Sequence, residues 1–143
     1  MTEIKKVAVI GAGVMGSGIA AHVANAGIPV VLLDIVPKDA DDRDVIAKSA
    51  IERMLKAQPA SDPLNAGFMI PENAKRVKPG NTEDHLAEAV RDTDGVVEVI
   101  LEELTLKREL FEKLDNLRKP GSIVISLSIA GSPKSKWIPA CAG

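Results

Sequence analysis

A short apolar run that leads into closely spaced glycines constrains the fold of this chain more than any other feature. Val7–Ile10 is continuous and apolar, which is typical of a strand buried on both faces. Gly11, Gly13 and Gly16 come next, and a stretch rich in Ala and other small residues continues to Gly27, where a helix would stop. The sequence therefore predicts a strand, a tight turn and a helix in immediate succession.

The rest of the chain repeats this alternation of strand-like and helical patterns. Such an alternation is typical of an α/β fold with a doubly wound, mostly parallel sheet. A helical insertion is expected after the second strand, and Thr82 is expected to cap the helix that follows the third. Strands are predicted at 29–34, 74–77 (ended by Pro79-Gly80), 95–101 and 122–126, and helices at 39–55, 83–91 and 104–117, the last with Leu106, Leu110, Phe111, Leu114 and Leu117 on one face.

The glycines that follow the first strand suit a loop that binds the phosphates of a dinucleotide. Gly11 permits the tight bend, Gly13 lets the backbone approach a pyrophosphate, and Gly16 lets the helix pack closely on the strand. Val14 and Met15 lie between these glycines. Backbone N–H groups and the positive end of the helix dipole would hold the phosphates, so the pattern predicts a Rossmann dinucleotide-binding fold.

An acidic residue at the end of the second strand indicates which dinucleotide is preferred. Asp34 would accept hydrogen bonds from the adenosine ribose hydroxyls, with Ile35 beside it, and its carboxylate would repel a 2′-phosphate. The nearest cation that follows is Lys38. We therefore expect NAD rather than NADP; the alternative is that Asp34 is an N-cap or a solvated strand end.

Composition restricts the class of protein further. Hydrophobic residues make up 45% and charged residues 27% of the 143, which fits one globular domain. The net charge is -2 without a basic stripe, so no nucleic-acid partner is expected. The single cysteine, Cys141, fits a reducing compartment, and neither a membrane-spanning run nor a signal-peptide pattern is present. We expect a cytoplasmic protein without a membrane partner.

Two stretches resemble the 3-hydroxyacyl-CoA dehydrogenases. Residues 6–20 are similar to the start of that family, including the continuation Met-Gly-x-Gly-Ile-Ala, and residues 97–111 are similar to a motif that separates it from other Rossmann enzymes. The resemblance covers roughly residues 5–126 and extends to the helical insertion. It implies NAD-dependent oxidation of (S)-3-hydroxyacyl-CoA to 3-oxoacyl-CoA, with hydride transfer to NAD, in fatty-acid metabolism such as β-oxidation.

The resemblance also implies roles for residues after the fourth strand. Val99 and Ile100 would lie along the nicotinamide half of the cofactor, and Glu102 and Lys107 would reach the nicotinamide ribose or the space beside it. The alternative is a surface ion pair, although five-residue spacing is not ideal for one helix face. The side chain of Glu98 is expected to point to the opposite face of the strand from those of Val97 and Val99. We therefore expect Glu98 to support its neighbours or cap the chain rather than act on substrate.

The likeness to the family fails after Ser126. The family has Ser-Asn-Thr-Ser there, whereas this chain has Ser126-Leu-Ser-Ile129, and residues 130–143 match none of the later sequence. The family's catalytic His–Glu pair has no counterpart, since no histidine follows His85, and both His22 and His85 are expected to be structural or exposed. We therefore assign no catalytic residue and no metal ligand, and expect the chain alone to be inactive.

We expect an NAD-binding domain over residues 1–126, a divergent tail over 127–143, and no helical substrate and dimerisation domain. We hypothesise a truncated or frame-altered product, which is wrong if no reading frame of the coding DNA restores the missing signals. Loss of that domain should uncover apolar surface, so self-association as a homo-oligomer is expected.

An acyl-CoA partner belongs to the full-length enzyme. A β-hydroxyacid dehydrogenase type of domain and a non-catalytic NAD-binding or structural module remain alternatives.

Overall fold

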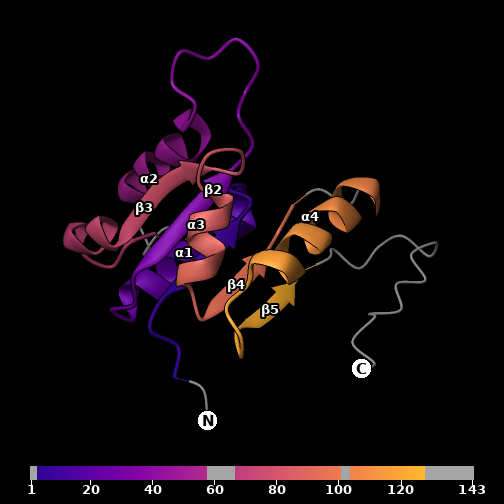
Figure 1. Ribbon diagram of the computed structural model, residues 1–143. Coiled ribbons are helices and arrows are strands. Elements are labelled where there is room, and N and C mark those ends of the chain that lie inside the picture. Colours follow the sequence, from indigo (N-terminus) through magenta and orange to yellow (C-terminus); the bar gives the residue numbers. More distant parts are fainter. Residues whose placement is uncertain (1–2, 58–66, 101–103, 128–143) are drawn as a thin grey trace, which may run out of the picture.

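A parallel sheet forms the centre of the protein, of which the computed structural model describes residues 3–57, 67–100 and 104–127 (Figure 1). Within these residues the sheet has five strands in the order β3-β2-β1-β4-β5. The elements in chain order are β1 (Val7–Ile10), α1 (Val14–Asn25), β2 (Val30–Asp34), α2 (Val45–Lys56), η2 (Pro71–Arg76), β3 (Val77–Asn81), α3 (Leu86–Asp92), β4 (Gly95–Glu98), α4 (Leu104–Leu117) and β5 (Ile123–Ser126).

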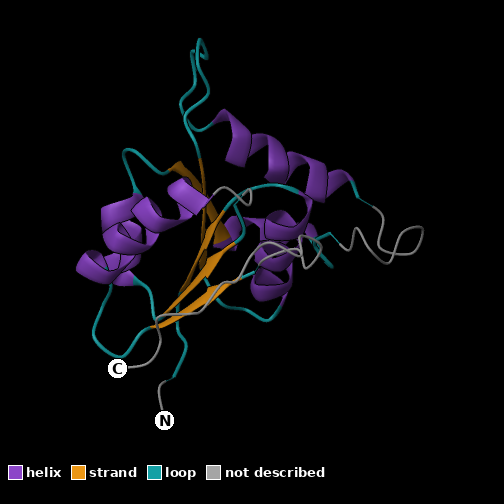
Figure 2. Ribbon diagram, turned by 90° about the vertical axis from the view of Figure 1, so that its right-hand side faces the viewer, coloured by secondary structure: helices purple, strands orange, loops and turns teal. Residues whose placement is uncertain are grey.

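Helices cover both faces of the sheet, which is seen edge-on in Figure 2. One apolar core joins α1 and α2 to alternate residues of β1 and β2, such as Val9 and Leu32. A second core joins α3 and α4 to the residues that point the other way, such as Ile10 and Leu33. Because successive side chains of a strand point to opposite faces, a continuous apolar run is what a strand between two helical layers requires.

The connections leave the sheet in opposite directions from its central pair of strands. β1 pairs in parallel with both β2 and β4, and Ile10 lies in register with Glu98. The chain after β1 continues into α1 on one face, whereas the chain after β4 continues into α4 on the other. A crevice therefore opens at the carboxyl ends of β1 and β4, where ligands bind in open α/β sheets.

The structure confirms the doubly wound parallel sheet and the helical insertion after the second strand. The predictions of β1 and α4 agree with the observed bounds. The predicted third strand at 74–77 is wrong, because those residues belong mainly to η2 and the strand runs through Pro79 and Gly80. Among the described residues β3 pairs with β2 alone and is thus an edge strand, the position in a sheet where a proline such as Pro79 is tolerated.

Smaller predictions also need correction, and two of them concern helix starts: α2 begins at Val45 rather than at residue 39, and α3 at Leu86 rather than at residue 83. The fourth strand ends at Glu98 rather than at residue 101, which lies outside the described residues. The side chain that caps the turn before α3 is that of Asn81 rather than Thr82, because Asn81 Oδ1 accepts the N–H groups of Glu83 and Asp84 at 3.1 and 2.7 Å.

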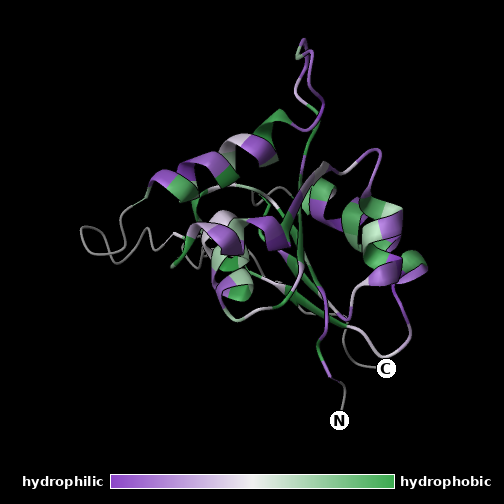
Figure 3. Ribbon diagram, turned by 90° about the vertical axis from the view of Figure 1, so that its left-hand side faces the viewer, coloured by the Kyte–Doolittle hydropathy of each residue, from purple (hydrophilic) through white to green (hydrophobic). Residues whose placement is uncertain are grey.

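The helices carry mixed faces, as the hydropathy colouring of Figure 3 shows for α2 and α4. Met54 of α2 and Leu114 of α4 are buried, while neighbouring charged residues face solvent. Within the ranges that the structure describes, no helix is both long and apolar enough to cross a bilayer.

Candidate dinucleotide-binding site

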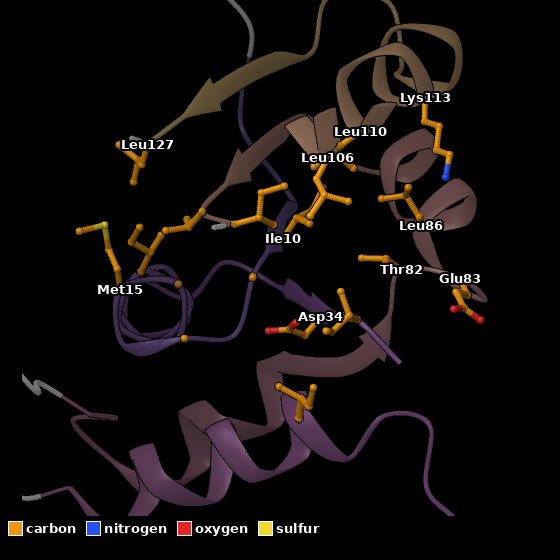
Figure 4. A pocket seen from close by; sticks show the side chains of 18 of the residues that line it. Ile10, Met15, Asp34, Thr82, Glu83, Leu86, Leu106, Leu110, Lys113 and Leu127 are labelled. Atoms are coloured by element: carbon orange, nitrogen blue, oxygen red, sulfur yellow. Dashed lines mark hydrogen bonds between the residues drawn. The ribbon is translucent and has the colours of Figure 1, made fainter. Parts of the chain in front are cut away.

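A cleft of about 1790 Å³ lies over the carboxyl ends of the strands (Figure 4). Met15 and Leu127 lie at one end of it, Glu83 and Lys113 at the other, and Asp34 between them. Nine of the site residues predicted from the sequence line the cleft, namely Gly11, Gly13, Val14, Met15, Gly16, Asp34, Ile35, Val99 and Ile100. Of the other two, Glu102 lies outside the described residues, and Lys107 is not among the lining residues.

The glycine loop is shaped by close backbone contacts. Gly11 has φ +111°, and a Cβ there would lie 2.6 Å from the carbonyl oxygen of Val99. A Cβ on Gly16 would lie 1.7 Å from the carbonyl oxygen of Gly11, so the first turn of α1 packs directly on the loop. These two positions therefore require glycine for the fold itself.

Gly13 differs from the other two because the space beside it is open. Apart from its own residue and its neighbours along the chain, no atom lies within 4 Å of the position that its Cβ would take. It is the N-cap of α1, and no side chain caps the helix there. The helix thus directs its first N–H groups and the positive end of its dipole toward the cleft, an arrangement that favours phosphate.

Asp34 connects the end of β2 to the glycine loop. Its Oδ2 accepts the N–H of Ala12 at 2.6 Å, and its Oδ1 accepts the N–H of Ile35 at 2.6 Å. An ionised carboxylate offers about four acceptor positions, so acceptor capacity for two ribose hydroxyls remains. Asp34 is therefore no N-cap: it fixes the loop and faces the cleft at the same time.

Several apolar side chains around the loop are unusually exposed. Val14, Met15 and Ile35 have 69%, 49% and 62% of their surfaces accessible, and all three line the cleft. Exposed apolar side chains that share one concave site are typical of a surface that a ligand covers.

The wall across from the loop is formed by the chain after β4. The N–H of Val99 donates to the carbonyl oxygen of Ile10 at 2.8 Å, which extends the β1–β4 pairing by one hydrogen bond. The carboxylate of Glu98 is fully buried and accepts the N–H of Ile100 at 2.7 Å. Glu98 thus supports the neighbouring chain, as predicted.

Lys107 also contacts Glu98. Its side chain is only 6% exposed, and its Nζ lies 3.7 Å from Glu98 Oε2. The sequence predicted contact with the cofactor, with an ion pair on the surface as the alternative. The structure shows that Lys107 forms a buried ion pair with Glu98, whereas the alternative from the sequence was a surface pair with Glu102.

Sequence reasoning missed the part of the cleft between α3 and α4. Leu86, Leu106, Leu110 and Lys113 lie along it. Leu106 was predicted as part of the core face of α4 but is 47% exposed at the rim of the cleft. The helical periodicity shows which residues share a face, yet it cannot separate the buried part of that face from the part that borders a groove.

His22 and Thr82 also line the cleft, which the sequence did not predict. His85 lies apart from it and accepts the N–H of Asn81 at Nδ1, 3.0 Å away, which is the structural role expected. No group of His, Cys, Asp or Glu side chains suited to a metal ion occurs within the described part of the chain.

Comparison with known proteins agrees with this geometry. Residues 6–133 match the family model of the 3-hydroxyacyl-CoA dehydrogenase NAD-binding domain. A protein of Deinococcus radiodurans described as a probable 3-hydroxyacyl-CoA dehydrogenase is 49% identical over 126 residues, and one of Bacillus subtilis with the same description is 43% identical over 138. These alignments cover 88% and 87% of this chain but 34% and 17% of the relatives.

A solved structure supports the same assignment. The 3-hydroxybutyryl-CoA dehydrogenase of Escherichia coli is 26% identical with a TM-score of 0.67, over 89% of this chain and 25% of that one. This chain therefore spans about a third or less of the length of these proteins. Since the family model covers most of its residues, the chain belongs to the 3-hydroxyacyl-CoA dehydrogenase family and carries the NAD-binding domain of that family.

Proposed function

We propose that this chain forms the NAD-binding part of an enzyme that oxidises (S)-3-hydroxyacyl-CoA to 3-oxoacyl-CoA, with hydride transfer to NAD. The observation that carries the proposal is the joint position of the glycine loop and Asp34 on one cleft, connected by the Ala12 N–H bond of 2.6 Å. The names of the relatives supply the substrate class. Cytoplasmic location, β-oxidation as the pathway and homo-oligomerisation stay predictions.

The cleft suggests how the cofactor lies. Asp34 and Ile35 would hold the adenosine ribose, and the loop from Gly11 to Gly16, with Val14 and Met15, would hold the pyrophosphate. The nicotinamide half would extend along Val99 and Ile100. We propose Glu102 and Lys107 as its neighbours at the far end, on the basis of the family resemblance.

The chemistry of this chain is then binding and orientation. Bound NAD supplies the hydride acceptor, and the cleft wall fixes the position of the ring. Oxidation of an alcohol also needs a base for the hydroxyl proton. The family resemblance assigns that task to a His–Glu pair that has no counterpart in this sequence. We accordingly propose no catalytic residue here.

The test of the cofactor site is a calorimetric titration of the chain with NADH and with NADPH. We expect saturable binding with preference for NADH, because the Asp34 carboxylate accepts ribose hydroxyls and repels a 2′-phosphate. Asp34→Arg should lower that preference about tenfold or more, the equivalent of one hydrogen bond to a charged group.

The matched control is Asp115→Arg, which makes the same charge change at a side chain that is 74% exposed on α4 and does not line the cleft. It should leave the ratio of the two dissociation constants unchanged. If Asp34→Arg leaves that ratio unchanged as well, Asp34 does not select the cofactor.

A further inference from the structure

A buried cluster of polar groups lies behind the cleft wall, apart from the residues that line it. Glu98 is 0% exposed, and its two carboxylate oxygens have three partners. Oε1 accepts the N–H of Ile100 at 2.7 Å, whereas Oε2 accepts the hydroxyl of Ser126 at 2.6 Å and lies 3.7 Å from Nζ of Lys107. The carboxylate thereby joins the ends of β4 and β5 to the first turn of α4.

The cluster occupies the point where the two halves of the fold diverge. Glu98 is in register with Ile10, the last residue of β1, which directly precedes the glycine loop. The next residue, Val99, is the one whose carbonyl oxygen would clash with a Cβ on Gly11. A small displacement of the chain after β4 would therefore change the contact between Val99 and the glycine loop.

A buried ion pair at this position calls for a reason beyond stability. Removing two charges from water is costly, and well-packed apolar residues of similar volume are often at least as stabilising. Lys107 is moreover in the first turn of α4, where the helix dipole disfavours a cation, so it depends on the Glu98 carboxylate for compensation. The pair is therefore weak evidence for a contribution to folding stability, and its placement against the cleft wall directs attention to geometry instead.

We infer that Glu98 is a positioning residue for the nicotinamide half of the cofactor. It holds the Val99–Ile100 wall through the Ile100 N–H, and its ion pair with the buried ammonium group of Lys107 holds the first turn of α4 behind that wall. The inference rests on the proposed cofactor site. It predicts that loss of the Glu98 charge weakens binding of the whole dinucleotide but not of its adenosine diphosphate half.

The experiment compares NADH with ADP by calorimetry on the full chain. Glu98→Gln keeps the size of the side chain and one acceptor for Ile100 but removes the charge that holds Lys107. We expect the dissociation constant of NADH to rise about tenfold, the equivalent of one charge-assisted hydrogen bond, while that of ADP stays within about twofold. An equal change for both ligands, or no change, would overturn the inference.

A double-mutant cycle identifies the route of the effect. In a Lys107→Met background, Glu98→Gln should cost much less NADH affinity than in the wild type, because the ion pair through which Glu98 holds α4 against the wall is already broken. Equal costs in the two backgrounds would show a general structural role instead. If Glu98→Gln does not fold, Ser126→Ala replaces it; this variant removes one bond to the same carboxylate and should raise the NADH constant alone, to a lesser extent.

The matched control lies at the other end of the same strand. Asp94 precedes β4, is 8% exposed, and accepts hydrogen bonds from Lys119 Nζ at 2.8 Å and from the Lys5 N–H at 2.9 Å. Asp94→Asn removes an ion pair at the opposite end of β4, one whose lysine is 50% exposed, so it should lower the melting temperature and leave the ratio of NADH to ADP affinity unchanged. A wild-type chain that binds neither ligand would refute the cofactor site itself, a result distinct from the failure of Glu98→Gln.

Discussion

Single atoms decide the shape of the glycine loop. Gly16 lies so close to Gly11 that its hydrogen occupies a place no methyl group can take. At Gly18, two residues further along α1, no atom beyond its own stretch of helix lies within 4 Å of the Cβ position. Both residues are in the same helix, so both pay the same entropic cost of glycine. The two positions therefore form a natural pair for measuring the close contact.

We expect opposite effects on stability from the same substitution at these positions. Gly18→Ala should raise the free energy of unfolding by roughly 0.5–1 kcal/mol, because alanine is the better helix former. Gly16→Ala should lower it by about 1–3 kcal/mol or more, because the methyl group forces α1 away from β1. Urea unfolding of both variants measures the difference. Two similar values would contradict the close packing seen at Gly16.

Residue roles were predictable where they follow from local geometry. The functions of Gly11 and Gly16 follow from the strand–turn–helix pattern, and the structure confirms both contacts. The hydrogen bond from the Ala12 N–H to Asp34 was not predictable, because the two groups meet only when β1 and β2 pair. The sequence shows an acid at the end of a strand but not what it accepts.

At the scale of the element, β4 has a buried carboxylate at each end. Asp94 stands at its amino end and Glu98 at its carboxyl end. The hydrogen bond from Lys119 lowers the pKa of Asp94, with further lowering by the Lys5 N–H, and the same pair raises the pKa of Lys119. The amino end of the strand is therefore held by a pair that depends on both charges.

This pair gives folding stability a predictable pH dependence. Because the folded-state pKa of Asp94 is lowered, its contribution is present above the unfolded value of about 3.9 and is lost as pH falls through the folded value. That of Lys119, with a raised pKa, is present below about 10.4 and is lost as pH rises through the folded value. Asp94→Asn should thus be less stable than the wild type near neutral pH and converge with it in acid. Denaturant unfolding at several pH values measures this, and a difference that persists undiminished in strong acid would contradict it.

The edge strand β3 shows why one element was misplaced. Its sequence, Val-Lys-Pro-Gly-Asn, carries two residues that usually end strands. Whether a proline is tolerated depends on whether the strand has one neighbour or two, and that is a property of the sheet rather than of the segment.

At the scale of the whole molecule, the described sheet has an apolar edge at β5. Ile123 and Ile125 are each 48% exposed and point to the same side of the strand. β4 is the strand with which β5 pairs in the described residues. An exposed apolar edge strand is a template for pairing with another chain.

We therefore expect the 143-residue chain to self-associate through β5. Sedimentation velocity should show a concentration-dependent increase in mean mass at tens of micromolar. Ile125→Lys should reduce that increase, since a charge on an edge strand opposes pairing. Leu55→Lys is the control, because Leu55 is similarly exposed, at 44%, but lies on α2. A monomer at these concentrations would refute the expectation.

The sequence by itself determined the class of fold, the glycine loop and the helix α4. These depend on short-range patterns, because backbone sterics and side-chain periodicity act within a few residues. The tertiary structure alone decided which groups meet: Asp34 with Ala12, Glu98 with Ser126 and Lys107, and α3 with α4 along the cleft. Those contacts join segments far apart in the chain, and they exist only after the strands have taken their order in the sheet.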